Sequence, residues 1–151
     1  MEKTLVILKP SCIRKALIGQ VTARFDQKGL QLVGMKMIQL DDAILNQHYS
    51  HLKEKPFFSR VKQSMMATPV IVQCWEGVNA VKVVRNLTGV TNGREAMPGT
   101  IRGDFSVSLQ ENIIHSSDNI DVAKIELERF FSKNEIYSYK QSISQYSTDE
   151  E

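Results

Sequence analysis

Alternating and continuous apolar segments divide the chain into predicted strands. Residues 3–9 alternate and then run apolar, and Pro10 ends the run because it removes a backbone donor. Residues 30–40 also alternate, whereas residues 69–75 (PVIVQCW) are almost continuously apolar, as expected of a buried central strand. A short strand is expected over residues 112–115 (NIIH). The pattern therefore predicts four strands.

Helical segments are predicted between these strands. Gly29 is a plausible C-cap for a helix that begins near Gly19, and Asp41 with Asp42 predicts an acid-capped helix after the second strand. Further helical segments are expected over residues 57–66, 78–86 and 119–131, the last preceded by an N-cap cluster of Ser116, Ser117 and Asp118. Strands that alternate with helices favour a two-layer α/β arrangement, with helices covering one face of a sheet.

One long segment does not follow either periodicity. Residues 87–112 are rich in Gly, Thr, Asn and Asp, and irregular segments of this length inside a compact domain are usually functional. Within it, two glycines flank Arg102, so we expect this arginine on a flexible backbone close to the sheet. The polar tail from residue 141 to residue 151 is expected either to wrap a neighbouring subunit or to be loosely ordered.

Composition narrows the class of protein. A chain of 151 residues with 42% hydrophobic residues fits one globular domain over residues 1–151. The formal net charge is only +2 and the charges are interleaved, so neither a nucleic acid nor a membrane surface is indicated as a partner. The N-terminal apolar stretch is too brief for a signal sequence or a membrane span, which predicts a cytoplasmic protein. Cys12 and Cys74 make neither a disulfide framework nor a zinc site, and Cys74 is expected to be a buried thiol.

His115 is the first candidate for chemistry. It lies at the end of a predicted strand and directly before a predicted helix N-terminus, where unpaired backbone N–H groups can hold an anion. A neutral imidazole nitrogen there could attack phosphorus and carry a covalent intermediate. Glu126 in the following helix could bond the other ring nitrogen and fix the tautomer. Taken alone, His115 is more often a cap or core histidine, and Glu126 a solvated surface charge.

Several cationic and hydroxyl side chains could join His115 around a phosphate. Arg102 suits bidentate phosphate binding, and Arg85, Thr91 and Lys9 could add a donor or a positive charge. Each of them alone is more often a surface residue. The chain has neither a P-loop nor the protein-kinase motif set. The residues by themselves therefore indicate a phosphate-binding site with a histidine and no more.

Taken together, these residues resemble a known family. From roughly Thr4 to Phe131 the chain resembles the nucleoside diphosphate kinases in the order and spacing of its motifs. The matching segments are Lys9-Pro10, His48-Tyr49, Pro56-Phe57-Phe58, Trp75-Glu76-Gly77, Thr91-Asn92, residues 98–105 (PGTIRGDF) and residues 112–118 (NIIHSSD). The last two motifs together are highly specific for the family.

The resemblance implies a fold, a reaction and a catalytic group. The implied fold is ferredoxin-like, a four-stranded antiparallel sheet with helices on one face, and the implied assembly is a homo-oligomer, a hexamer or a tetramer, with the hexamer preferred. The implied reaction transfers the terminal phosphate of a nucleoside triphosphate to a nucleoside diphosphate. It would be reversible and ping-pong, with His115 phosphorylated on Nδ1 and oriented by Glu126 and Ser117.

The resemblance also assigns the nucleotide contacts. It implies that Mg²⁺, carried mainly by the nucleotide phosphates rather than by a protein metal site, acts with phosphate-binding residues that match Arg85, Thr91 and Arg102. The residues that match Lys9 and Asn112 would contact the sugar hydroxyls, and the tyrosine that matches Tyr49 would lie beside the transferring phosphate. The base would lie between Phe57 and Leu109. Because these base contacts are apolar, broad base specificity is expected.

The chain departs from the family pattern at several positions. Ser116 replaces a glycine after the histidine, which would alter the placement of His115 if that glycine has a backbone conformation costly for serine. Ser11 and Cys12 stand where Asp and a small residue are usual, and Gly93 replaces a proline, which is expected to loosen the loop. The chain also lacks the common Tyr-Glu ending, which leaves the oligomer size open.

Alternative functions remain open at this level. His48 and His51 could face together like metal ligands, but no third ligand is nearby in the sequence. A ferredoxin-like sheet also serves as an RNA or regulatory platform, which would need exposed aromatic residues on strands and no histidine. A purely structural oligomer would differ from the enzyme in failing to take up acid-labile phosphate from labelled ATP.

Overall fold

A four-stranded antiparallel sheet forms the centre of the molecule. The computed structural model describes residues 1–141, with the strands β1 (Glu2–Leu8), β2 (Gln31–Ile38), β3 (Val70–Gly77) and β4 (Ile114–Ser116). The strand order is β2-β3-β1-β4, and each neighbouring pair is antiparallel, which confirms the ferredoxin-like sheet. The expectation for the polar tail falls on residues 142–151, which lie outside the described residues.

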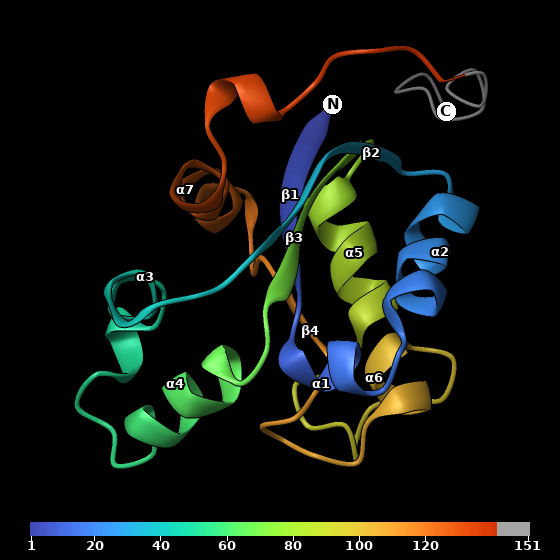
Figure 1. Ribbon diagram of the computed structural model, residues 1–151. Helices are drawn as coiled ribbons and strands as arrows, with labels where there is room; N and C mark the ends of the chain where they lie inside the picture. The colour runs from blue at the N-terminus through green and yellow to red at the C-terminus, as the bar shows by residue number, and fades with distance from the viewer. Residues whose placement is uncertain (142–151) are drawn as a thin grey trace.

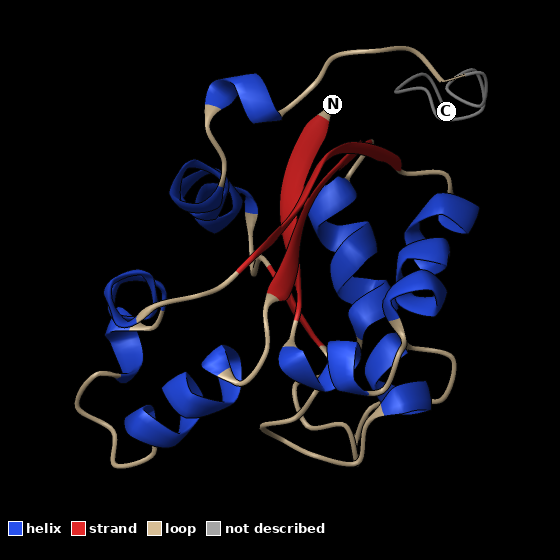
Figure 2. Cartoon of the chain, in the orientation of Figure 1, coloured by secondary structure: helices blue, strands red, loops and turns tan. Residues whose placement is uncertain are grey.

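Helices connect these strands and make up most of the remaining regular structure (Figure 2). The α-helices are α1 (Pro10–Arg14), α2 (Ile18–Lys28), α3 (Asp42–His48), α4 (Phe58–Met66), α5 (Ala80–Thr88), α6 (Ile101–Phe105) and α7 (Ile120–Phe130). Two short 3-10 turns, η1 (Ser50–Leu52) and η2 (Lys133–Glu135), complete the described elements. No helix in residues 1–141 is long and apolar enough to cross a membrane.

Helices pack against both faces of the sheet, which corrects the expectation that they cover one face only. Leu5 and Ile7 of β1 point into a core shared with α3, α4 and α7, whereas Val6 and Leu8 point into a second core with α1, α2, α5 and α6. Figure 1 shows the two groups on opposite sides of the strands. The reason is visible in β3, which is buried along almost its whole length. A strand apolar on both sides needs cover on both sides.

Local sequence signals set several helix ends as predicted. The Asp41 side chain accepts a hydrogen bond from the Ile44 N–H at 2.9 Å and caps α3. Gly29 ends α2 in the left-handed region at φ 101°, where glycine has no steric cost. The predicted cap of α7 is corrected, because Asn119 rather than the preceding serines or Asp118 accepts from the Val122 N–H, at 2.9 Å.

The segment expected to be a flexible loop contains the helix α6. The Thr100 side chain caps this helix by accepting from the Gly103 N–H at 3.0 Å. A Cβ atom at Gly103 would lie 1.9 Å from the carbonyl oxygen of Met97, so only glycine fits there. The glycine after Arg102 therefore serves close packing rather than flexibility, and Arg102 itself is buried.

β4 is a short edge strand that places the candidate nucleophile. Its register with β1 pairs Ile7 with His115, so both side chains lie on the α3, α4 and α7 side of the sheet. Ile113, the residue directly before β4, has a positive φ of 74°, which is uncommon for a β-branched residue. Its N–H donates to the Ser11 hydroxyl oxygen at 3.0 Å, and this bond supports the strained turn into the strand.

Candidate functional site

His115, Glu126 and Ser117 form a connected group between β4 and α7. The His115 Nε2 atom lies 2.8 Å from the Glu126 carboxylate, whose second oxygen accepts from the Ser117 hydroxyl at 2.6 Å. Glu126 lies beyond the first turn of α7, so His115 is positioned by the side of this helix. The structure thus places the predicted carboxylate against the imidazole, whereas the helix N-terminus expected directly after His115 begins only at the cap residue Asn119.

The ionised carboxylate of Glu126 determines which tautomer the neutral His115 imidazole adopts. Burial raises the pKa of Glu126, but the hydrogen bonds from His115 and Ser117 and the charge of His115 outweigh it and lower the pKa to about 2. A carboxylate can only accept, so the His115 Nε2 atom carries the proton in this contact. Nδ1 is then the unprotonated nitrogen of the neutral ring, and no hydrogen-bond partner is recorded for it in residues 1–141.

His48 and Arg129 extend this group through contacts that were not predicted from the sequence. Arg129 donates from Nη1 to His48 Nδ1 at 2.8 Å, and the His48 ring stacks edge-on against His115 with 4.7 Å between centroids. Burial, then the neighbouring His115, lowers the pKa of His48 to about 3, so this ring stays neutral. The contact between Arg129 and His48 joins α7 to α3, and no local pattern in either helix predicts it.

The grouped donor atoms also bear on the question of a metal. The ligand atoms of His48, His115 and Glu126 lie within 4.8 Å of one another, a spacing that could hold an ion. His51, the partner suggested by sequence spacing, is not part of this group. The group is rich in nitrogen, and its carboxylate is already bonded to His115 and Ser117. It does not resemble the oxygen donor sets that Mg²⁺ prefers.

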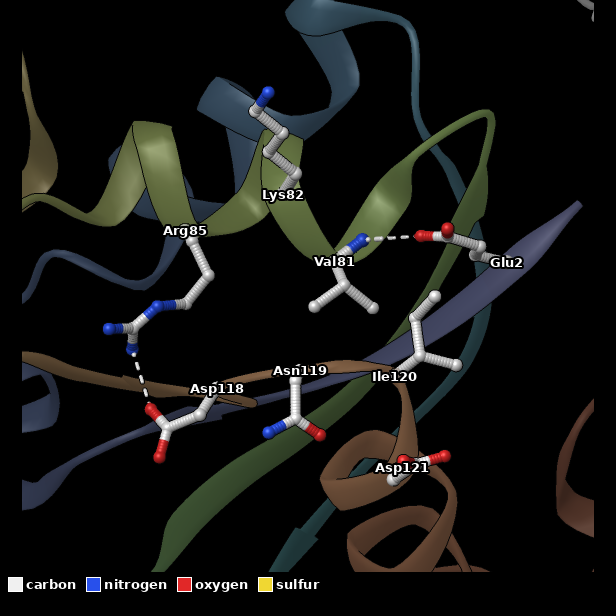
Figure 3. A pocket seen from close by; sticks show the side chains of 8 residues that line it. All are labelled: Glu2, Val81, Lys82, Arg85, Asp118, Asn119, Ile120 and Asp121. Carbon is white, nitrogen blue, oxygen red and sulfur yellow. Dashed lines mark hydrogen bonds and ion pairs between the residues drawn. The ribbon is translucent and has the colours of Figure 1, made fainter.

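Arg85 reaches the surroundings of His115 from α5, on the opposite face of the sheet. Its guanidinium donates to the Ser116 carbonyl at 3.4 Å and pairs with the Asp118 carboxylate at 3.2 Å. Figure 3 shows the side chain of Arg85 extending from α5 toward Asp118. Both residues line one hollow of about 500 Å³. Arg85 and Asp118 also line the hollow of about 460 Å³ that contains His115. The arginine therefore separates two adjacent hollows.

Arg102 is brought to the same hollow but is mostly engaged by the backbone. Its guanidinium donates to the carbonyl oxygens of Ile114 at 2.7 Å, Gly89 at 3.1 Å and Asn112 at 3.2 Å. Burial, followed by the charge of Arg85, lowers its pKa to about 10, so it remains charged near neutral pH. Of five N–H donors, these bonds leave two for an anion. Arg102 thus joins the loop to β4 in addition to lining the site.

Lys9 and Asn112 lie between the hollow that contains His115 and a further hollow next to it, and they line both. The Lys9 ammonium donates to the Asn112 side-chain oxygen at 2.6 Å, and the Asn112 amide donates to the Thr91 carbonyl at 2.9 Å. Burial and the nearby charge of Arg102 lower the pKa of Lys9 to about 7. Burial also raises the pKa of Tyr49, which keeps its phenol protonated. An entering anion would favour the charged form of Lys9.

A third, more apolar hollow of about 350 Å³ adjoins Lys9 and Asn112. Phe57 and Leu109 line it and are 37% and 56% exposed, so their faces are open to a ligand. It shares four lining residues with the hollow that contains His115, namely Lys9, Tyr49, Thr91 and Asn112. Of the predicted site residues, all line one of these two hollows except Ser117, which lies buried behind Glu126. The structure therefore brings the predicted site together.

The departures from the family pattern are accommodated by specific contacts. Ser11 supplies the oxygen that accepts from the Ile113 N–H. Ser116 is not among the residues with positive φ, so the concern that serine would be strained there does not apply. Gly93 donates its N–H to the Ser108 carbonyl at 3.0 Å, a bond that proline cannot make.

Comparisons with known proteins show which family the chain is similar to. A family model described as nucleoside diphosphate kinase matches residues 2–136. A curated relative from Parabacteroides distasonis, named nucleoside diphosphate kinase, is 60% identical over 152 residues and the match spans 99% of each chain.

Two solved structures extend the similarity to the fold. The nucleoside diphosphate kinase of Halobacterium salinarum, in complex with CDP, has a TM-score of 0.94 at 36% identity over 96% of this chain and 97% of that one. A transition state mimic of nucleoside-diphosphate kinase from Borrelia burgdorferi, with bound vanadate and ADP, has a TM-score of 0.91 at 35% identity over 97% and 96%. With the family model covering most of its length, the chain belongs to the nucleoside diphosphate kinase family.

Proposed function

We propose that the chain transfers the terminal phosphate of a nucleoside triphosphate to a nucleoside diphosphate through phosphorylated His115, by a ping-pong mechanism. The observation that carries the proposal is the contact of 2.8 Å between His115 Nε2 and Glu126. It leaves Nδ1 as the ring nitrogen with a free lone pair in a hollow lined by cationic side chains. Membership in a phosphotransferase family supports the same reaction.

In the first half-reaction Nδ1 of neutral His115 attacks the γ-phosphorus. The N–P bond forms while the bond from the γ-phosphorus to the β,γ-bridging oxygen breaks, and the bridging electron pair leaves with the nucleoside diphosphate. The ring gains positive charge, which the Glu126 carboxylate offsets because it stays ionised. A second diphosphate then reverses these steps. One site serves both substrates because the phosphate waits on His115 between them.

The transferring phosphate needs charge stabilisation more than further covalent help. Arg85 and the two remaining donors of Arg102 can contact its equatorial oxygens, and the exposed Thr91 hydroxyl can join them. Tyr49 lies in the same hollow, beside the expected phosphate position.

Mg²⁺ fits this site as an ion carried by the nucleotide. Among the described residues of the hollow, the carboxylate outside the histidine group is that of Asp118, which is 72% exposed and paired with Arg85. Mg²⁺ commonly keeps several waters and binds substrate phosphates with one or two carboxylates. When bound, it would neutralise charge on the phosphate oxygens, and Asp118 is the residue that could approach it.

The rest of the nucleotide would extend into the apolar hollow. Lys9 and Asn112 are positioned to bind the sugar hydroxyls, and Phe57 and Leu109 to hold the base between their exposed faces. Stacking accepts any aromatic base, so we propose broad base and sugar specificity.

The decisive experiment measures acid-labile phosphate on the enzyme after incubation with γ-labelled ATP. We expect the wild-type chain to become labelled and to release the label to any added nucleoside diphosphate. His115→Asn should abolish both labelling and turnover, whereas His51→Asn, which removes an imidazole from the same neighbourhood, should keep them. Labelling of the His115→Asn protein, or its turnover at the wild-type rate, would refute the mechanism.

We also propose that the chain forms a homo-oligomer, with a hexamer as the preferred size. The support is a set of exposed apolar residues on the β2 edge and on the long loop, including Met35, Met37, Met97 and Val107. A cytoplasmic location is proposed with it, in keeping with two free and buried thiols, Cys12 and Cys74.

A further inference from the structure

The apolar hollow has a polar rim that the stacking account of base recognition does not use. Beside Phe57 and Leu109, the hollow is lined by the polar side chains of Arg60, Ser64 and Gln110. Arg60 lies one turn of α4 beyond Phe57, and Gln110 directly follows Leu109. Each apolar wall therefore carries a polar neighbour, and these two neighbours, Arg60 and Gln110, contact one another.

Hydrogen bonds hold this rim in one arrangement. Arg60 Nε donates to the Gln110 side-chain oxygen at 3.1 Å, and the Gln110 amide nitrogen donates to Glu111 at 3.2 Å. The same Glu111 oxygen accepts from the Ser64 hydroxyl at 2.7 Å. The Glu111 carboxylate thus orients the Gln110 amide, with its nitrogen toward Glu111 and its oxygen toward Arg60. The contact between Arg60 and Gln110 links α4 to the segment before β4.

The guanidinium of Arg60 carries hydrogen-bond donors that this network does not use. Gln110 uses its oxygen on Arg60, and Glu111 accepts from two side chains. The two terminal nitrogens of Arg60 have no recorded acceptor among the residues that the structure describes. A planar guanidinium held at one nitrogen presents its other N–H groups in a fixed direction. A base between Phe57 and Leu109 would meet these donors at its edge.

Bases differ at the group such a donor would meet. Guanine and hypoxanthine carry a carbonyl oxygen at position 6 and uracil one at position 4, whereas adenine and cytosine carry an amino group there. A guanidinium donates well to a carbonyl oxygen, and to N7 beside it in a purine, but it opposes an amino group that is itself a donor. Selectivity would then follow the exocyclic group rather than the size of the ring.

We propose that Arg60, held in place by Gln110, contacts the base edge and favours keto bases over amino bases. The proposal rests on the proposed function, because it requires the base to lie between Phe57 and Leu109. Arg60 is exposed, so water competes for its donors and the preference is several-fold rather than absolute. The enzyme would still accept every nucleoside diphosphate.

The experiment compares acceptors that differ only at the base edge. Phosphorylated enzyme is mixed rapidly with the diphosphates of inosine, guanosine, adenosine, uridine and cytidine, and the second-order rate constant for loss of the phosphoenzyme is measured for each. The informative quantities are the inosine to adenosine ratio and the uridine to cytidine ratio. Both should exceed one in the wild type, by about three- to tenfold.

Variants separate base reading from general charge. Arg60→Ala should bring both ratios close to one, and Arg60→Lys should recover them only in part because it lacks the planar fork. Gln110→Ala should give intermediate ratios, since Arg60 stays charged but loses its anchor. Lys55→Ala is the control, because Lys55 is an exposed cation just before Phe57 that lines neither hollow. It should leave both ratios unchanged.

Binding provides a second readout that does not depend on turnover. The dissociation constant of adenosine diphosphate divided by that of inosine diphosphate, measured by calorimetry, should fall in Arg60→Ala by the same factor as the inosine to adenosine ratio of rate constants. Ratios unaffected by Arg60→Ala, or an equal loss for all five bases, would overturn the proposal while leaving the phosphotransfer intact. Failure of the wild type to form a phosphoenzyme would instead refute the proposed function.

Discussion

Glu126 is the residue on which the candidate nucleophile depends. It is 5% exposed, and it is bonded from two sides by His115 and Ser117. A buried carboxylate without partners would be costly, so the three side chains stabilise one another. Its pKa of about 2 is below its ordinary value of 4.5, which means that folding favours the ionised form. Its contribution to stability is therefore present above pH 4.5 and is lost as the pH falls toward 2.

Glu126→Gln should slow phosphoenzyme formation at least about tenfold and lower stability at neutral pH by on the order of 2 kcal/mol. The stability difference from wild type should shrink as the pH is lowered from 5 to 3, because the wild-type carboxylate loses its advantage there. Urea unfolding at several pH values measures this change. A difference independent of pH would mean that Glu126 is not ionised in the native contact.

The sequence predicted the chemical residues better than the residues that hold them. His115 and Glu126 could be paired because a strand followed by a helix returns the chain along the sheet. The contact from Arg129 to His48 joins residues from distant segments and depends on how α3 packs against α7. Arg60 and Gln110 are likewise distant in the sequence and meet only in the folded chain. Sequence patterns do not predict such pairs, since each member alone resembles an ordinary polar surface residue.

At the scale of elements, the loop between α5 and β4 differs most from its prediction. Glycine and polar content indicated an irregular, flexible segment, and residues 101–105 instead form α6. Its glycines are required by close approach, at Gly103 to the Met97 carbonyl and at Gly89 to the Thr100 side chain. Arg102 then ties the segment to three carbonyls. Composition predicts where such a loop lies, but long-range contacts decide whether it is ordered.

The Gly93 departure gives a test at this scale. Restoring the usual proline with Gly93→Pro should destabilise the protein by about 1–3 kcal/mol, although proline in a loop ordinarily adds up to about 1 kcal/mol. The substitution removes the N–H bond to Ser108, and a Cβ atom there would lie 2.5 Å from the Ser106 carbonyl oxygen.

Unfolding in urea measures the effect, with Gly19→Ala as the matched control. A Cβ at Gly19 meets no atom within 4 Å, and alanine is favoured in a helix, so this variant should be neutral or more stable. A Gly93→Pro protein more stable than wild type would mean that the loop rearranges and that the bond to Ser108 is dispensable.

For the molecule as a whole, one edge of the sheet is only partly covered. The segment after η2 runs along the start of β2, where the Tyr137 N–H donates to the Val33 carbonyl at 2.8 Å and the Tyr139 hydroxyl bonds the Leu32 carbonyl. Farther along the same strand, Met35 and Met37 are 52% and 57% exposed. Exposed apolar side chains on an edge strand are a natural surface for association.

We expect light scattering to report an oligomer at micromolar concentration. Replacing Met35 and Met37 together by lysine should reduce the mass, because two charges would be buried in the contact, and should lower thermal stability on dilution. Gln63→Lys, on an exposed position of α4, adds charge elsewhere and should not change the mass. A wild-type monomer would remove the oligomer proposal without affecting the chemistry.

Because of the short strand β4, we expect the active site to lose its structure at a lower free energy than the protein needs to unfold. It has three residues, lies at the edge of the sheet and carries His115. Edge segments held by few strand pairs, as β4 is by its three pairs with β1, can open locally at a lower free energy than global unfolding requires. Such an opening would withdraw His115 from Arg85 and Lys9 while β1, β2 and β3 stayed paired. Turnover would then fail on warming before the native fold is lost, and a bound nucleotide, by tying the edge to the loop, would delay that failure.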